Sequence, residues 1–247
     1  MTRGILKVLN GASLATASGS TVASGASVDM GNNNVALGLE PIIASGSGVD
    51  GNGAIVNSSG YGGNAVATSF QNLTLAGDIT IGGPGRLDFR STDPSGGSDA
   101  VLSTTGHAYN LTKVSVGTLQ LASVQVDSAL ANITVQQGTL SLQGNMPTLG
   151  NSSSNLTVAS GASLQFLDLA NEVNKPLVLN DGAIVNNTGS TIFDGTVMLM
   201  GNGFFNVGGS LTFTNVISGV GNLAQIGGAG TMYLSAPNAY TGQTLVN

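Results

Sequence analysis

The densest group of side chains suited to chemistry lies near the middle of the chain. It contains two arginines, three aspartates and the single histidine of the sequence, at Arg86, Asp88, Arg90, Asp93, Asp99 and His107. Paired carboxylates cleave glycosidic bonds in many enzymes, and a mixture of arginine and aspartate also suits a binding patch. The same residues fit a solvated loop, in which charges are tolerated because nothing stacks on them. We expect the solvated loop, keep the binding patch as the alternative, and predict no catalytic site, metal site or cofactor.

The rest of the sequence offers little other chemistry. One histidine and no cysteine leave no Ser/His/Asp arrangement, thiolate metal site or disulfide to infer. The segment PSGGS between Asp93 and Asp99 supplies too few oxygen ligands for Ca²⁺. The glycine-rich run near Gly219 precedes no predicted helix, so it is not a phosphate loop. No acidic or basic residue lies in 195–247, which excludes acid–base catalysis from that part of the sequence.

The composition narrows the classes of partner. Charged residues make up only 7% of the chain, the formal net charge is −6, and the six Lys and Arg residues form no basic stripe. Nucleic acid and anionic lipid are therefore not expected as partners. The opening MTRGILKVLNGASLA has no apolar run long enough for a signal peptide, and no stretch approaches the roughly 18 apolar residues of a membrane span. If the chain is exported, its signal was removed or lies outside this sequence.

The elements that must position these residues are repeated strand–turn–strand units. The clearest copies are ITVQQGTLSL from Ile133, LTVASGASLQF from Leu156 and LVLNDGAIV from Leu177. Weaker copies are ILKVLNGASLA from Ile5, TVASGASV from Thr21, LTLAGDITI from Leu73 and VSVGTLQL from Val114. Alternation with period two and β-branched residues, broken by Gly, Asn and Ser, is typical of strands and turns rather than helices.

A nearly constant spacing of turn glycines indicates stacked units. These glycines stand at positions 117, 138, 161, 182 and 203. The octets GAIVNSSG from Gly53 and GAIVNNTG from Gly182 also match. This period predicts one domain over 1–247, a parallel β-helix of about 11 coils of about 21 residues and on the order of 50 Å long. The stretch from Gly85 to Gly117 is clearly longer than one period, so 84–110 is predicted to be a charged insertion loop.

The stacking of coils gives the low charge a physical cause. Equivalent positions lie above one another at strand spacing, where two like charges repel by about 1 kcal/mol in water and by several times more near a protein surface. Asn, Ser and Thr can instead hydrogen-bond along the stack. The motifs NLT at Asn72, NLT at Asn110, NIT at Asn132 and NLT at Asn155 are therefore predicted to form asparagine ladders rather than glycosylation sites. Most of Phe166, Phe193, Phe204, Phe205 and Phe213 are predicted to stack inside the coils.

The C-terminal segment 217–247 resembles the passenger-associated repeat of bacterial autotransporters, also called the autotransporter-associated β-strand repeat. The resemblance rests on the ISGxGxL opening at Ile217–Leu223, the GxGTxxLS core at Gly228–Ser235 and the NxYTGxT closing at Asn238–Thr244. Gln225 and Leu245 replace the Lys and Gly usual in that repeat, and residues 1–216 are only loosely similar to it. The resemblance implies a right-handed β-helix that is exported to the bacterial cell surface.

Three functions follow as expectations. The first is a non-catalytic secreted or cell-surface rod, acting as a structural stalk or adhesin that meets a host or cell-surface glycan or protein. The second is a self-assembling extracellular filament, because the exposed strand edges of an uncapped β-helix can pair head to tail. The third is a polysaccharide lyase or hydrolase on the same scaffold, with Asp88, Asp93 and Asp99 as its carboxylates. We predict no direct insertion of this chain into a membrane.

Overall fold

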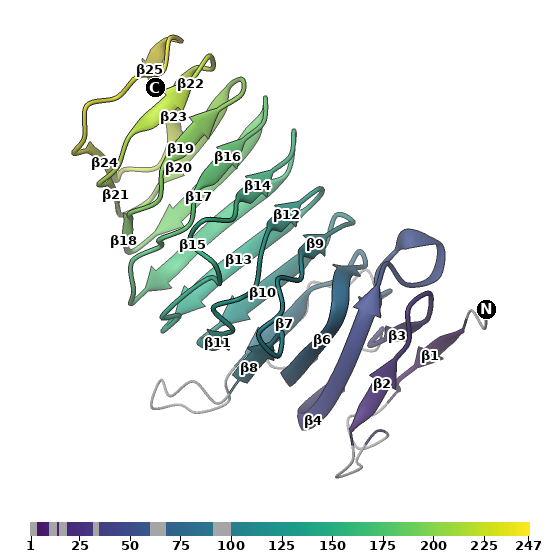
Figure 1. Cartoon of the computed structure of the whole chain (residues 1–247). Helices are drawn as coiled ribbons and strands as arrows, with labels where there is room; N and C mark the ends of the chain where they lie inside the picture. Colours follow the sequence, from purple (N-terminus) through teal and green to yellow (C-terminus); the bar gives the residue numbers. More distant parts are fainter. Residues whose placement is uncertain (1–3, 10–13, 15–18, 32–34, 60–67, 91–99) are drawn as a thin grey trace.

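The chain folds into a parallel β-solenoid of about ten stacked coils (Figure 1). The computed structural model describes residues 4–9, 14, 19–31, 35–59, 68–90 and 100–247. These residues contain no α-helix, and the short 3-10 helix η2 (Val49–Gly51) interrupts the second coil. The predicted parallel β-helix is confirmed, with slightly fewer coils than the repeat period indicated.

The strands of each coil lie on three faces, and the first face runs through almost the whole stack. Its neighbouring strands pair in parallel, each with the equivalent strand of the next coil. They are β1 (Ile5–Lys7), β3 (Ser27–Asp29), β5 (Ile55–Val56), the end of β6 (Thr68–Gly82), β9 (Leu111–Lys113), β12 (Ile133–Val135), β14 (Leu156–Val158), β16 (Leu177–Leu179), β19 (Val197–Leu199) and β22 (Ile217–Gly219).

The second face follows the first along the chain. Its strands are the start of β4 (Val35–Gly46), the start of β6, β7 (Leu87–Arg90), β10 (Thr118–Ala122), β13 (Thr139–Gly144), β15 (Ser163–Leu169), β17 (Ala183–Thr188), β20 (Gly203–Val207), β23 (Leu223–Gly227) and β25 (Thr244–Val246). The clearest sequence repeats, from Ile133, Leu156 and Leu177, each supply one first-face and one second-face strand, as predicted.

The third face is less continuous. It contains β2 (Ser20–Val22), the later part of β4, the middle of β6, β8 (Ala100–Ser103) and β11 (Val124–Val126). Further along, β18 (Ser190–Phe193), β21 (Ser210–Phe213) and β24 (Thr231–Leu234) form a separate three-stranded sheet. This arrangement changes the interpretation of the two matching octets. The octet from Gly53 supplies a first-face strand and its match from Gly182 a second-face strand, so equal sequences occupy different faces.

Left-handed backbone makes the corners between faces. Gly138 has φ of 71° and Gly161 also 71° at the corner between the first and second faces, as their repeat spacing predicted. The next corner uses two residues other than glycine, Ser123 with φ of 52° and Asp168 with φ of 47°. The predicted strand from Val114 begins late, because residues 114–117 form a corner in which Ser115 has φ of 67° and β10 starts only at Thr118.

Aliphatic and aromatic side chains fill the interior in columns. One column follows Leu111, Ile133, Leu156, Leu177, Val197 and Ile217 from coil to coil, and all of these are almost fully buried. Each such side chain stabilises the stack by roughly 1.5–3 kcal/mol. The predicted interior phenylalanines are confirmed for Phe166, Phe193, Phe205 and Phe213, whereas Phe204 is only partly buried. The rings of Phe166 and Phe193 lie 6.0 Å apart and those of Phe193 and Phe213 5.8 Å apart.

Polar ladders run along the outside of the stack. The Asn132 side-chain amide donates to Asn110 Oδ1 at 3.0 Å, and the backbone N–H of Asn155 donates to Asn132 Oδ1 at 3.0 Å. Asn110 in turn donates to Asp78 from the preceding coil. The predicted asparagine ladder is therefore confirmed for three of the four motifs. Asn72 lies on the third face, where it pairs with Pro41 and Val101, and so it is not part of this ladder.

A second ladder begins in the same way. The backbone and amide N–H groups of Asn202 both donate to Asp181 Oδ1 at 2.8 Å. Asn222 then donates to Asn202 at 2.6 Å, and the backbone N–H of Gln243 donates to Asn222 at 2.6 Å. Each ladder thus starts on one aspartate and continues through uncharged amides, which keeps like charges out of neighbouring coils.

Two strands within the expected insertion at 84–110 belong to the stack. Leu87 pairs with Leu119, well over one period further along the chain, so this coil is long, as the spacing of glycines indicated. However, β7 pairs with β10, β8 pairs with β11, and the N–H of Leu111 bonds to the next coil. The prediction of a loop over the whole range was wrong, because alternating Leu87, Phe89, Ala100 and Leu102 give these strands an apolar inner side that is fully buried.

Two lysines lie inside the rod. Lys113 is 2% exposed and occupies a column of the first face whose neighbours are Ile81 and Val135. Its Nζ donates to the backbone carbonyls of Val114 and Ser115, both at 2.7 Å, and to that of Gln137 at 3.1 Å. Lys175 is fully buried and donates to the Asn151 carbonyl at 2.8 Å. Burial lowers the pKa of each lysine to about 8.

Candidate functional site

The structure brings three residues of the predicted patch together on and beside β7. Arg86 Nε donates to Asp88 Oδ1 at 2.7 Å, and Arg90 Nη1 lies 3.7 Å from Asp88 Oδ2. Asp88 is 1% exposed, whereas the two arginines are partly exposed. The three residues therefore form a salt-bridge cluster with a shielded carboxylate at its centre.

The register of the second face continues this cluster into the next coils. Asp88 pairs with Gln120, which pairs with Ser141, and all three point away from the interior column of Leu87 and Phe89 neighbours. Arg86 also donates to the Gln120 side chain, whose amide donates to Gln143. Neither glutamine was predicted from the sequence to belong to the site. Their signal was weak, because Gln120 lies in one of the weaker repeats and Gln143 directly follows the repeat from Ile133.

The electrostatics of Asp88 reflect its burial. Desolvation raises the pKa of the Asp88 carboxyl, and the hydrogen bond from Arg86 and the charges of Arg86 and Arg90 only partly oppose this rise. Asp88 Oδ2 is buried and accepts no hydrogen bond within the described part of the chain. A raised pKa suits a general acid, but this carboxylate is shielded and held by two cations. The geometry suits a structural ion pair better than acid–base catalysis.

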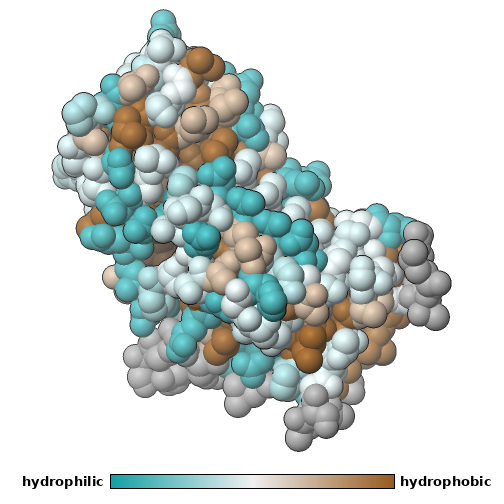
Figure 2. Space-filling view, in the orientation of Figure 1, coloured by the Kyte–Doolittle hydropathy of each residue, from teal (hydrophilic) through white to brown (hydrophobic). Residues whose placement is uncertain are grey.

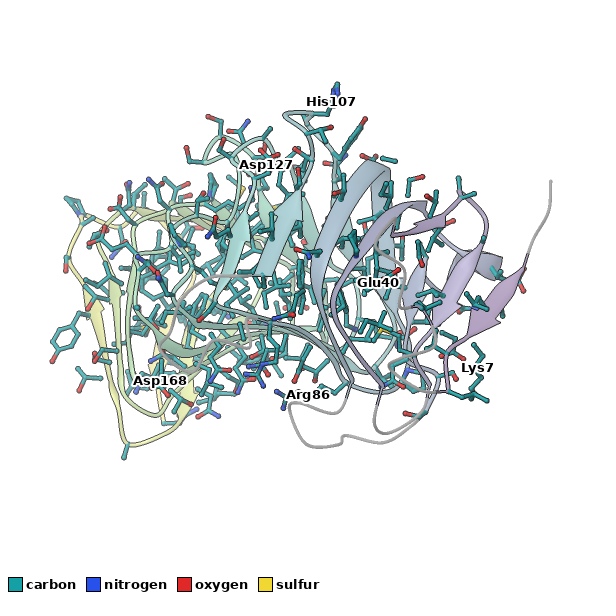
Figure 3. The ribbon with its side chains drawn as sticks, turned by 90° about the horizontal axis from the view of Figure 1, so that it is seen from below. Lys7, Glu40, Arg86, His107, Asp127 and Asp168 are labelled. Atoms are coloured by element: carbon teal, nitrogen blue, oxygen red, sulfur yellow. The ribbon has the colours of Figure 1, made fainter. Side chains whose placement is uncertain are left out.

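His107 does not join this cluster. Figure 3 shows Arg86 and His107 on opposite sides of the coil. His107 lies in the exposed turn between β8 and β9, where its ring stacks on that of Tyr109 at 5.3 Å. The turn is held by Asp127, which accepts the backbone N–H groups of Thr104 at 2.9 Å and Gly106 at 3.2 Å. Desolvation raises the pKa of Asp127, but the hydrogen bond from the Ala129 N–H and those from Thr104 and Gly106 outweigh it and lower the pKa.

The remaining two residues of the predicted patch, Asp93 and Asp99, lie outside the described residues. The proposed pair of catalytic carboxylates with Asp88 therefore stays a prediction. In the part of the chain that the structure describes, no group of three or more His, Cys, Asp or Glu side chains is arranged to hold a metal ion.

A groove on the N-terminal coils, here called the N-terminal groove, was not predicted. It has a volume of about 250 Å³ and crosses four successive strands or corners of the first face, with Ile5, Asp29, Val56 and Pro84 among its lining residues. These residues are far apart in the sequence and share no motif. They come together only through the pairing of β1 with β3, β3 with β5 and β5 with β6.

The short helix η2 forms one wall of the N-terminal groove, and Ser27 holds it in place. Ser27 Oγ accepts the N–H of Val49 at 2.9 Å and donates to the Gly53 carbonyl at 2.7 Å. A Cβ on Gly48 would lie 1.8 Å from that carbonyl oxygen, so only glycine fits there. Asp50 has a left-handed backbone with φ of 53°. Strained backbone of this kind is found at ligand-binding sites more often than elsewhere.

Hydrophobic residues are exposed at both ends of the rod. Figure 2 shows hydrophilic residues over the middle of the face in view and hydrophobic atoms towards both the N-terminal and the C-terminal coils. The N-terminal coils include the exposed Ile5 and Leu9, and the C-terminal coils include Met200, Val220 and Tyr233, which are 54%, 73% and 52% exposed. Within the described residues, no helix has the length and apolar character needed to cross a membrane.

Comparisons with models of protein families, with curated proteins and with solved structures returned no significant match. The assignment of function therefore depends on the geometry of the rod and its surface.

Proposed function

We propose that the chain is a non-catalytic, secreted rod that serves as a structural stalk or adhesin at the bacterial cell surface. The observation that carries this proposal is the uninterrupted parallel pairing of the first face from β1 to β22. Such pairing makes a stiff element that can hold a binding surface away from the cell. The resemblance of residues 217–247 to the autotransporter repeat supports the same location.

The chemistry of the rod also favours a passive role. Asp88 is buried between two arginines, and the external ladders are built from amide and hydroxyl groups that bond to one another. Such ladders stiffen the stack without presenting reactive groups. Release of new reducing ends or unsaturated sugars from a polysaccharide by the purified chain would contradict this part of the proposal.

Antibody labelling of the source cells tests the location. We expect the chain to be labelled on intact cells and to be removed by protease added outside. Labelling only after permeabilisation would overturn the proposal. The filament alternative stays a prediction, and negative-stain microscopy of the purified chain tests it, since only single rods would contradict assembly.

A further inference from the structure

We infer that the N-terminal groove binds an uncharged sugar unit of a glycan chain. This inference extends the proposed function. It depends on that proposal only for the location, the cell surface, at which the chain would meet a glycan. The groove crosses successive strands of the first face, which lie about 4.8 Å apart, so it runs along the axis of the rod. A linear polymer lying along that axis could place one residue in the groove and continue over the neighbouring coils.

The polar centre of the N-terminal groove is a fixed carboxylate. Asp29 is only 5% exposed. Its Oδ1 accepts the N–H of Ser58 at 3.0 Å, and its Oδ2 accepts the Ser58 hydroxyl at 2.6 Å. A carboxylate has about four acceptor positions, so Asp29 can accept further hydrogen bonds from sugar hydroxyls. Its orientation is already set, which reduces the entropy that binding would cost.

Apolar side chains line the groove beside this carboxylate. They are Ile5, Val49, Val56 and Pro84, and the other polar lining residues are Ser27, Asp50, Asn52, Ser58 and Ser115. A site that is mainly apolar with a few placed polar groups is typical of small-molecule binding. A sugar ring matches it, because C–H groups on its faces pack against aliphatic side chains while hydroxyls at its edge meet Asp29 and Asn52. The volume of about 250 Å³ is below the roughly 300–1,000 Å³ typical of drug-sized ligands and suits one ring.

Charge excludes other classes of ligand. Asp29 and Asp50 both line the groove, so a phosphate or a uronate would meet carboxylates. A divalent cation also fits poorly. Both oxygens of Asp29 already face donors of Ser58, and Lys7 Nζ lies 3.8 Å from Oδ2. A metal ion would have to bind beside that ammonium group, on oxygens that already accept two hydrogens.

Titration calorimetry of the purified full chain with tetrasaccharides tests the inference. The probes are chitotetraose and cellotetraose, which are uncharged, and tetragalacturonate, which is anionic. We expect at least one uncharged probe to bind in the millimolar range and the anionic probe to bind at least about tenfold more weakly. No binding of either uncharged probe, or tighter binding of tetragalacturonate, overturns the inference.

Substitutions locate the binding. Asp29→Asn removes the charged acceptor, and Asn52→Trp fills the groove from an exposed position and leaves Asp29 in place. We expect each to weaken binding by about tenfold or more. Asp127→Asn is the matched control, because Asp127, like Asp29, accepts a backbone N–H from a neighbouring coil, but it lies far from the groove. Unchanged binding by Asn52→Trp, with its circular dichroism intact, also overturns the inference. Cell labelling tests the surface location and calorimetry tests the groove. A negative result in one experiment therefore does not decide the other proposal.

Discussion

The coils before Leu111 and those after it differ in length and in how regularly they stack. On the first face Val28 pairs with Ile55, and Ile79 pairs with Leu111, so each of these coils exceeds the period of the later repeats. Beyond Leu111 the coils become shorter, as between Leu177 and its partner Val197. The long coils contain the 3-10 helix, the groove and the Arg86–Asp88 cluster, whereas the short coils contain little beyond strands and corners.

The difference shows what regular stacking demands. In a short coil every position has a near-identical neighbour about 4.8 Å above and below, so a charge must be either single within its ladder, like Asp181, or buried and hydrogen-bonded, like Lys175. A longer coil carries residues without equivalents in the next coil. Those residues are free to hold opposite charges side by side or to leave a cavity. The irregular coils are therefore the part of this rod in which charged clusters and cavities can form.

The largest expected effect compares the interior of the short coils with the interior of the long coils. Phe193 has ring neighbours on both sides, Phe166 and Phe213, whereas Phe89 stacks on Phe70 at 4.7 Å. We expect Phe193→Ala to lower the free energy of unfolding by about 4 kcal/mol and Phe89→Ala by about 3 kcal/mol. Urea denaturation measures both. A greater loss from Phe89→Ala would show that the long coils, not the short ones, dominate the stability.

The second prediction concerns the charged cluster of the long coils. Arg86→Ala leaves the buried Asp88 carboxylate with Arg90 alone, so we expect a loss of about 3 kcal/mol in the free energy of unfolding. Adding Asp88→Asn should recover most of that loss, because the uncompensated charge is gone. Lys7→Ala serves as the control, since Lys7 is half exposed in its pair with Asp29 and should cost under about 1 kcal/mol. No recovery in the double variant would show that Arg86 acts through packing.

The third prediction uses pH on the buried lysines. The unfolded pKa is 10.5 and the folded pKa about 8, so between these values the unfolded state binds more protons and stability rises with pH. For Lys175 the rise amounts to at most about 3 kcal/mol. For Lys113, whose pKa is lowered to the same value, we expect a rise of similar size. Urea midpoints at pH 7.5 and 10 measure the rise, which Lys175→Met should reduce and Lys7→Met should leave unchanged. An equal change in urea midpoint between pH 7.5 and 10 in the parent chain, Lys175→Met and Lys7→Met would contradict the assignment of the rise to Lys175.

The smallest expected effect tests the rule of one charge per ladder. Asn202→Asp places a carboxylate directly above Asp181, and we expect a loss of about 1–2 kcal/mol. Asn132→Asp is the matched change, because its ladder neighbours are Asn110 and Asn155, and it should cost less. The difference should shrink in 1 M salt, where the Debye length is about 3 Å. Equal losses at low salt would show that charge does not set the composition of the ladders.

Much of the regular half could be predicted from the sequence. Alternating apolar residues from Ile133 onwards predicted the strands, and the NLT and NIT motifs predicted the ladder, because both are local patterns repeated once per coil. Local patterns failed where position in the coil decides the outcome. The strand expected at Val114 is a corner, and the corner residues Ser123 and Asp168 carry no glycine signal.

The sites could be predicted less well for the same reason. Arg86, Asp88 and Arg90 are close in sequence, and so their cluster was visible. His107 is also close in sequence, but the coil turns between them and carries it to the opposite side. The groove could not be found in this way, because Ile5, Asp29, Val56 and Pro84 become neighbours only through the register of four coils.

The asparagine ladders give the rod a polarity. In each ladder the later coil supplies the N–H donors and the earlier coil supplies the acceptor, starting from an aspartate that can only accept. A coil that leaves the ribosome later than the coil before it therefore meets acceptors that the earlier coil already presents. Coils can then add to the stack one at a time from the N-terminal end, before the rest of the chain has folded.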